Sequence, residues 1–169
     1  RKRGGGLFGS NPLTGSIGVV TINLPRIGMK SDNLDEFKVE LKKMADLARD
    51  SLEIKRKVIE EQTEKGLYPY SARFLKGAKE RFNSYWHNHF STIGVIGMNE
   101  ALLNLIGKDI TTEEGQKVSL EVMNYLRDII TGYQEETGHV YNLEATPAEG
   151  VSYRLAKIDR EKYGKDIIT

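Results

Sequence analysis

Hydrophobic residues recur at two different spacings along this chain of 169 residues. Short runs rich in β-branched or apolar residues, at 19–24, 91–97 and 140–143, have the length and composition of strands. Between these runs, apolar residues three and four positions apart indicate amphipathic helices. Long helices that alternate with short strands favour an α/β fold, with parallel strands joined by crossover helices and buried on both faces.

The first long helix is predicted to follow Ser31 or Asp32, either of which can cap it, and to end before Gly66. We interpret the basic patch at 55–57 as a solvated helix face, although it could also meet phosphates. Residues 67–70 then form a break, because the residue before a proline is pushed out of helical geometry. The apolar positions of this helix are Leu34, Phe37, Leu41, Met44, Ala45, Ala48 and Leu52.

Two more helices are predicted between the second and third strands. The first is short, spans 99–106 and is closed by Gly107. Thr111 and Glu114 have the spacing of a capping box, which opens a long helix that ends at Gly138. The strand at 91–97 contains too many glycines for an edge strand, so we expect another part of the backbone to pass close to it.

The first strand lies between a glycine-rich loop and a proline. Residues 4–18 contain six glycines and are predicted to form a flexible loop. Pro25 is expected to end the strand, because proline cannot donate to a sheet ladder. Asn23 and Arg26 then lie at the carboxyl end of a strand, where open α/β sheets and barrels bind ligands. The alternative is a turn amide and a surface arginine.

The segment Thr146-Pro147-Ala148-Glu149-Gly150 follows the third strand and leads into a predicted helix. Free backbone N–H groups and the helix dipole make the start of a helix a site for an anion such as phosphate. The hydroxyls of Thr146 and Ser152 could add donors. The alternative is a capped helix, with Thr146 as the cap and Pro147 in the first turn.

Two further motifs are weaker. His87 and His89 are two residues apart, without a carboxylate or cysteine at metal-ligand spacing, so we expect packing and no metal site. The basic tract at 1–3 before three glycines is a single short copy without interleaved aromatic residues, which argues against RNA binding.

Composition narrows the functional class. The formal net charge is +1, too small for bulk nucleic-acid binding. No apolar run is long enough to cross a bilayer and no secretory signal follows the basic start, so we predict a cytoplasmic protein. The sequence contains no cysteine, which excludes disulfides, thiolate metal sites and thiol nucleophiles. Both ends look cut, which suggests an internal piece of a larger enzyme.

Three blocks, taken together and in order, carry a resemblance to a known family. They are residues 14–26 (TGSIGVVTINLPR), 89–100 (HFSTIGVIGMNE) and 141–150 (YNLEATPAEG). The chain resembles the anaerobic, class III ribonucleoside-triphosphate reductases over nearly its whole length. The resemblance implies that residues 1–169 are a fragment of one catalytic domain, a ten-stranded α/β barrel of the glycyl-radical enzyme type.

The resemblance also implies a chemistry and a set of roles. In this family a separate iron–sulfur activase uses S-adenosylmethionine to make a glycyl radical, which generates a thiyl radical that attacks the ribose. Residues 1–18, with Gly15, Ser16 and Ile17, look like an arm of the finger loop, and 19–169 supply strand and helix units. Asn23 matches an asparagine beside the ribose. Residues 146–150 and Ser152 match the segment that holds the substrate phosphates.

Several family features are missing from this sequence. The radical cysteine, the four-cysteine zinc site, the glycyl-radical motif and the ATP-binding regulatory domain would lie outside it, so the segment alone is expected to be inactive. The full-length protein is expected to carry the radical, structural zinc and ATP or dATP effectors, and to form a homodimer. The alternatives are the core of a related glycyl-radical lyase and a non-catalytic nucleotide-binding module.

Overall fold

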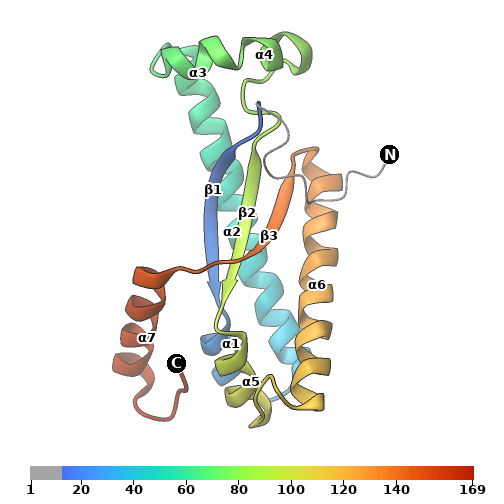
Figure 1. Ribbon diagram of the computed structural model, residues 1–169, viewed down its shortest axis with the longest axis vertical. Coiled ribbons are helices and arrows are strands. Elements are labelled where there is room, and N and C mark those ends of the chain that lie inside the picture. Colours follow the sequence, from blue (N-terminus) through green and yellow to red (C-terminus); the bar gives the residue numbers. More distant parts are fainter. Residues whose placement is uncertain (1–12) are drawn as a thin grey trace.

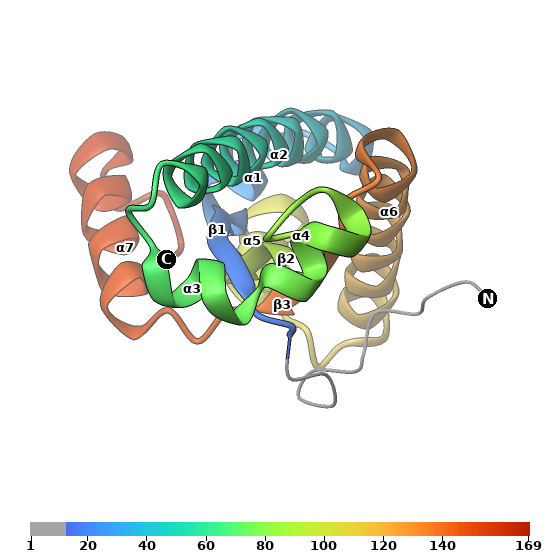
Figure 2. The ribbon, with the colours of Figure 1, turned by 90° about the horizontal axis from the view of Figure 1, so that it is seen from above.

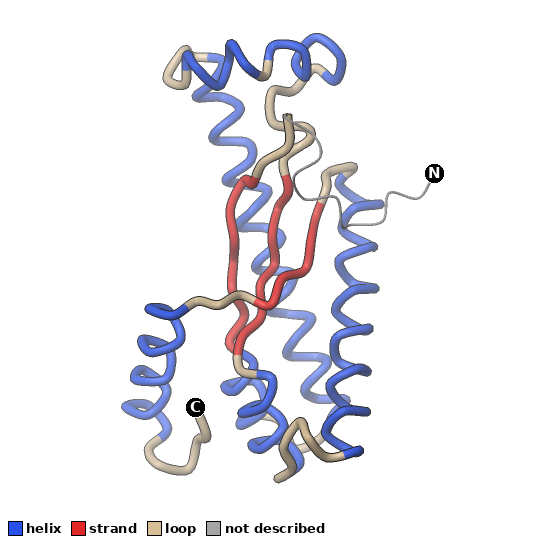
Figure 3. Tube along the Cα trace, viewed as in Figure 1, coloured by secondary structure: helices blue, strands red, loops and turns tan. Residues whose placement is uncertain are grey.

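Three parallel strands form the centre of the fold in this computed structural model, which describes residues 13–169. They are β1 (Ser16–Asn23), β2 (Phe90–Ile96) and β3 (Tyr141–Ala145), in the order β1-β2-β3 (Figure 1). Figure 3 shows that every connection between them contains helices. The predicted α/β class with parallel strands and crossover helices is confirmed. The basic tract and the part of the glycine loop within residues 1–12 lie outside the described residues.

The two faces of the sheet differ in character. Side chains alternate between faces along a strand, and on one face they join the hydrophobic core with α2 (Leu34–Glu64) and α6 (Glu113–Thr137). The other face carries Thr21, Gly94 and Glu144 side by side across the strands. Val19 is 49% exposed. The prediction that the strands are buried on both faces was therefore wrong for β1 within the described chain. The core positions of the sheet include Val20, Ile22, Ile93, Val95, Tyr141 and Leu143.

Helix α2 runs along the sheet and packs against β1 and β2, while α6 lies beside β3 (Figures 1 and 2). The cap of α2 is Asn33, whose side chain accepts from the backbone N–H of Glu36. The Glu36 carboxylate in turn accepts from the N–H of Asp32, which completes a reciprocal cap. The cap therefore lies one or two positions after the predicted Ser31 or Asp32. The hydroxyl of Ser31 instead donates a hydrogen bond to the carbonyl of Ile27.

Two short helices begin where strands end. Helix α1 (Leu24–Lys30) follows β1 directly, with Pro25 in its first turn, where a missing N–H costs nothing. The expectation that Pro25 only terminates a strand missed this helix. Helix α5 (Met98–Ile106) follows β2 and closes at Gly107, as predicted, with a φ of 67°. Both helices pack against each other below the carboxyl edge of the sheet.

Helices α3 (Pro69–Phe74) and α4 (Lys76–Phe82) lie at one end of the molecule, and α7 (Glu149–Tyr163) lies towards the other end. Helices α3 and α4, which the sequence did not predict, sit at the amino end of the sheet (Figure 1). Thr112, rather than Thr111, caps α6 by accepting from the N–H of Gly115, and Gly138 closes that helix as predicted. Helix α7 follows β3. Within residues 13–169, no helix has both the length and the apolar character needed to cross a membrane.

The glycine-rich loop is shorter than predicted, because β1 begins at Ser16. The N–H of Phe90 donates to the carbonyl of Gly15, which ties this end of β1 to β2. The imidazole of His89 occupies the space that a Gly15 side chain would need. Gly15 and Ser16 therefore form the amino end of the sheet, about one strand length from Asn23.

The interpretation of 55–57 as a solvated face is wrong for Arg56, although Lys55 and Lys57 are exposed. The Arg56 side chain is only 4% exposed and donates to the carbonyls of Trp86 and His89 and to Ser91 Oγ. Burial lowers the pKa of Arg56, although the guanidinium stays charged. The three acceptors lie on the segment that enters β2, so Arg56 fixes that entry and does not face a ligand in solvent.

His89 gives a prediction for the pH dependence of stability. Burial, with a smaller effect of Arg56, lowers the pKa of His89, so the folded protein holds a neutral imidazole. The unfolded chain takes up this proton near pH 6.5, about the ordinary value. Below that pH the unfolded state binds more protons than the folded state. The contribution of His89 to the free energy of unfolding is therefore complete above about pH 6.5 and decreases as the pH is lowered towards the pKa of His89 in the folded state.

Urea unfolding followed by the fluorescence of Trp86, whose ring lies 4.8 Å from that of His89, measures this effect. The urea concentration at the unfolding midpoint is expected to decrease as the pH is lowered from about 7 to about 5. His89→Phe should make this decrease smaller. An equally steep dependence in the His89→Phe variant would contradict the assignment.

Candidate functional site

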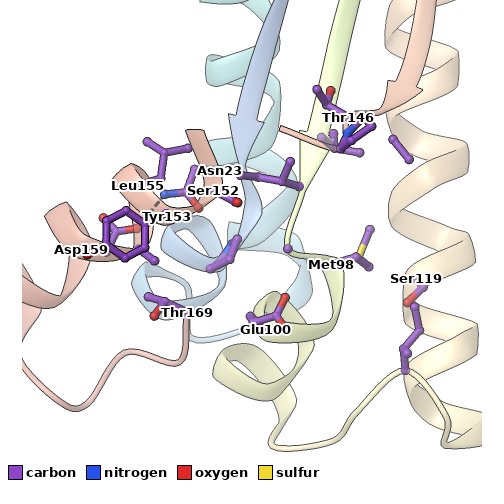
Figure 4. A pocket seen from close by; sticks show the side chains of 18 of the residues that line it. Asn23, Met98, Glu100, Ser119, Thr146, Ser152, Tyr153, Leu155, Asp159 and Thr169 are labelled. Atoms are coloured by element: carbon purple, nitrogen blue, oxygen red, sulfur yellow. Dashed lines mark hydrogen bonds between the residues drawn. The ribbon is translucent and has the colours of Figure 1, made fainter. Parts of the chain in front are cut away.

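A pocket of about 770 Å³ opens at the carboxyl edge of the sheet (Figure 4). Residues that follow all three strands line it, together with the inward side of α7. This edge is where parallel α/β sheets bind ligands, because the loops after the strands and the starts of the following helices converge there. The polar side chains on its wall include Asn23, Glu100, Thr146, Ser152 and Asp159.

Helix α7 closes the pocket from the side of β1. The chain leaves β3, crosses the carboxyl edge of the sheet and enters α7 beside β1 and α1 (Figures 1 and 2). The backbone N–H of Thr146 donates to the carbonyl of Val95, which holds the crossing segment against β2. Residues 23 and 146–159 therefore meet, although more than 120 residues separate Asn23 from Thr146 in the sequence.

The carboxyl end of β1 is joined to α7 by one carboxylate. Asn23 Nδ2 donates to Asp159 Oδ2 at 2.6 Å, and Arg26 Nε donates to Asp159 Oδ1 at 2.6 Å. Arg26 Nη2 also lies 2.6 Å from Oδ1. Asp159 is fully buried, and the Arg26 side chain is 34% exposed. Asn23 and Arg26 are thus neither a simple turn amide nor an unpaired surface arginine.

The loop between β3 and α7 has an unusual start for a helix. Ala148 is the N-cap, with a left-handed φ of 45°, and no side chain among residues 13–169 caps the first turn. The alternative in which Thr146 caps the helix and Pro147 sits in its first turn is therefore wrong. Within the described chain, the N–H groups of the first turn are therefore available to an anion.

The side chain of Thr146 occupies space that is free because residue 94 is a glycine. Its Oγ1 is buried and has no hydrogen-bond partner among the described residues. It packs over Gly94, where a Cβ would overlap Thr146 Oγ1 and lie 3.2 Å from Thr21 Oγ1. The close approach predicted for the glycine-rich strand thus exists, and the segment that passes is the β3–α7 loop.

The pocket brings together only some of the residues singled out from the sequence. Asn23, Thr146, Pro147 and Ser152 line it, whereas Ala148, which ends the loop, and Glu149 and Gly150, which begin α7, do not line it. The Ser152 hydroxyl donates to the carbonyl of Glu149. Gly15, Ser16 and Ile17 lie at the opposite end of β1.

The two histidines of the 87–89 segment take part in ring packing. His87 stacks on Phe82 with ring centroids 4.2 Å apart, and His89 packs edge-on against Trp86. Among residues 13–169, no group of three or more histidine or acidic side chains is placed to hold a metal ion.

Sequence reasoning missed Asp159. The residue lies among charged neighbours on α7, where its spacing gives no sign of burial, and its partners are 133 and 136 residues away. The charge of the pocket lining was not predicted from the sequence. None of the described residues that line the pocket is basic, and the two carboxylates belong to Glu100 and Asp159. An anion bound here would therefore depend on backbone N–H groups and hydroxyls.

Comparison with known proteins decides the family. The protein-family model for anaerobic ribonucleoside-triphosphate reductases matches residues 1–169. The chain belongs to the anaerobic ribonucleoside-triphosphate reductase family. The reductase of Haemophilus influenzae is 27% identical over 160 residues, which cover 88% of this chain and 22% of that protein. The reductase of phage T4 is 30% identical over 165 residues, which cover 90% of this chain and 26% of that protein.

Solved reductase structures share the fold. The Thermotoga maritima anaerobic ribonucleotide reductase with citrate in its active site matches with a TM-score of 0.77 and 27% identity, over 93% of this chain and 29% of that one. The same enzyme in complex with dATP and CTP matches with a TM-score of 0.77 and 28% identity, over 96% and 27%. The chain thus spans about a quarter of the length of these reductases.

Proposed function

We propose that this chain is the substrate-binding part of an anaerobic ribonucleotide reductase that converts ribonucleoside triphosphates to deoxyribonucleotides. The observation that carries the proposal is that Asn23 and the β3–α7 loop share one pocket, although they are far apart in sequence. A polar amide at one side, and at the other the loop that leads directly into the start of α7, suit a ligand with a sugar at one end and phosphates at the other.

The proposed orientation follows from charge. The phosphates lie at the start of α7, where N–H groups and the helix dipole compensate for the lack of basic lining residues. Thr146, Pro147 and Ser152 line this end of the pocket, and the backbone N–H groups of Ala148, Glu149 and Gly150 would form the cradle beside it. Asn23 then faces the ribose. Citrate in the active site of the T. maritima enzyme, and its complex with dATP and CTP, are compatible with an anionic ligand and a nucleotide.

The reaction needs groups that this sequence lacks. Without a cysteine, the chain cannot form a thiyl radical, so we propose that it is inactive alone and acts within a longer polypeptide. That polypeptide would supply the radical cysteine, the glycyl radical, structural zinc and the sites for ATP or dATP, and would depend on an S-adenosylmethionine-dependent iron–sulfur activase. The radical removes a hydrogen atom from the ribose, and the residues of this chain hold the nucleotide in place.

The same proposal covers architecture and setting. Residues 1–169 would be one part of a ten-stranded catalytic barrel, with β1 and β3 pairing with further strands and the polar face of the sheet turned inward. The residues before β1 would be an arm of the finger loop that enters from the amino end, with Gly15 at its base and with Ser16 and Ile17 as the first residues of the strand. We expect the complete enzyme to be a cytoplasmic homodimer with no nucleic-acid or membrane partner.

Anaerobic turnover by the complete enzyme tests this function. With its activase, S-adenosylmethionine and a reductant (formate or a thiol system), the enzyme should convert at least one ribonucleoside triphosphate to its deoxy form, as measured by chromatography. Omission of the activase is the control. A protein that carries the glycyl radical and reduces none of the four common ribonucleoside triphosphates would overturn the proposal and favour a glycyl-radical lyase. A protein that binds nucleotides but never acquires the radical would favour a non-catalytic module.

A further inference from the structure

Helix α7 has an unusual buried residue. All of α7 lies within the described chain, and the one residue that it buries is the carboxylate of Asp159. Burial of a carboxylate is costly unless it is paired, and a hydrophobic residue of similar volume would often dock a helix equally well. Packing therefore does not explain why an aspartate occupies this position.

The contacts of Asp159 define the orientation of Asn23. One carboxylate oxygen accepts from Asn23 Nδ2, and the other is paired with the Arg26 guanidinium. A carboxylate paired with a guanidinium acts as an acceptor, so the NH₂ end of the Asn23 amide must face it. The amide oxygen is then the end left over, and it has no hydrogen-bond partner among the described residues. Figure 4 shows Asn23 on the pocket wall, on the side of Asp159.

We infer that Asp159 is a positioning residue that fixes the Asn23 amide so that its oxygen accepts a hydrogen bond from a ribose hydroxyl of the bound nucleotide. This inference rests on the proposed function, and it adds which end of the Asn23 amide faces the ribose. Arg26 holds the second oxygen of Asp159 and so keeps the carboxylate from rotating. Without Asp159, the amide can turn and present its NH₂ group to a hydroxyl that should donate.

A double-mutant cycle in the complete reductase tests the inference. Asp159→Ala is expected to lower kcat by about 10²-fold, the usual cost of a misplaced reacting group, with little change in the KM for the nucleotide. If Asp159 acts through Asn23, then Asp159→Ala should lower kcat by less than about twofold when Asn23 is already alanine. Rates are expressed per glycyl radical, measured by electron paramagnetic resonance, so that a loss of activation is not counted.

Two variants complete the design. Asp159→Asn keeps the shape, but its amide cannot accept from both Asn23 and Arg26, so kcat should fall as in Asp159→Ala. Glu161→Gln removes an exposed carboxylate two residues further along α7 and should leave kcat unchanged.

The outcomes separate the two ideas. If Asp159 only docks α7, its removal shifts the phosphate segment at the start of that helix, so the KM for the nucleotide rises. The effects of Asp159→Ala and Asn23→Ala on kcat then multiply in the double variant. That result, with Asn23→Ala strongly impaired, overturns the role of Asp159 and leaves the proposed function intact. An active enzyme that tolerates Asn23→Ala would instead remove Asn23 from the site, and with it both ideas about this pocket.

Discussion

Asn23→Ala in the complete reductase is expected to lower turnover by about 10²–10³-fold, the typical cost of removing one well-placed hydrogen-bonding group from an active site. Asn23 is the last residue of β1 and lies on the pocket wall, held by Asp159. The truncation removes the amide without changing the sheet, because the core face of β1 is formed by other side chains such as Ile22. Folding and glycyl-radical formation should therefore be retained.

The measurement is the rate of deoxyribonucleotide formation, with the radical content determined on the same sample. Asn124→Ala is a matched control, because Asn124 is an exposed residue of α6 outside the pocket lining. It should leave the rate unchanged. An Asn23→Ala enzyme with the wild-type rate would contradict the placement of Asn23 beside the ribose.

Gly94→Ala is expected to lower kcat/KM by about 10²-fold, because a displacement of roughly 1 Å in a substrate-holding segment can have that effect. The new methyl group would overlap Thr146 Oγ1 and come within 3.3 Å of Thr146 Cβ, so the threonine itself has to move. Its N–H is bonded to the carbonyl of Val95, so the movement disturbs the whole entry to α7. Overpacking at this buried position should also cost about 1–3 kcal/mol of stability.

Gly132→Ala is the matched control for this substitution. Gly132 lies inside α6 and is exposed, and no neighbouring atom lies within 4 Å of the place that an alanine methyl group would take. Alanine there should stabilise the helix by about 0.5–1 kcal/mol and leave kinetics unchanged. Steady-state kinetics and urea unfolding of the two variants give the comparison. Wild-type kcat/KM for Gly94→Ala would show that Thr146 does not contribute to binding.

The alternation of strands and helices could be predicted from sequence because each element carries its own local signal. The β-branched runs before Asn23 and within 91–97, and the glycines that close α5 and α6, appear in the structure close to the predicted positions. Such signals depend on periodicity and on backbone preferences, which are properties of neighbouring residues.

Errors arose where local signals were ambiguous or were overridden by tertiary contacts. Pro25 suits both the end of a strand and the first turn of a helix, and only the structure shows the second. Arg56 belongs to a basic run that looks solvated, yet the chain entering β2 supplies three acceptors that allow it to be buried. Val19 looks like a core residue, but the second face of the sheet is open at that position in the described chain.

The amino-acid sequence by itself determined the α/β class, the order of the main elements and the family resemblance, because these depend on patterns along the chain. The resemblance also implied that Asn23 and Thr146 lie on one substrate. The tertiary structure alone decided that Asp159 joins them in one pocket, that Gly94 makes room for Thr146 and that Asp159 is buried against Arg26. The physical reason is that these contacts join residues more than 50 positions apart, whose proximity follows from strand order and from the path of the chain across the sheet edge.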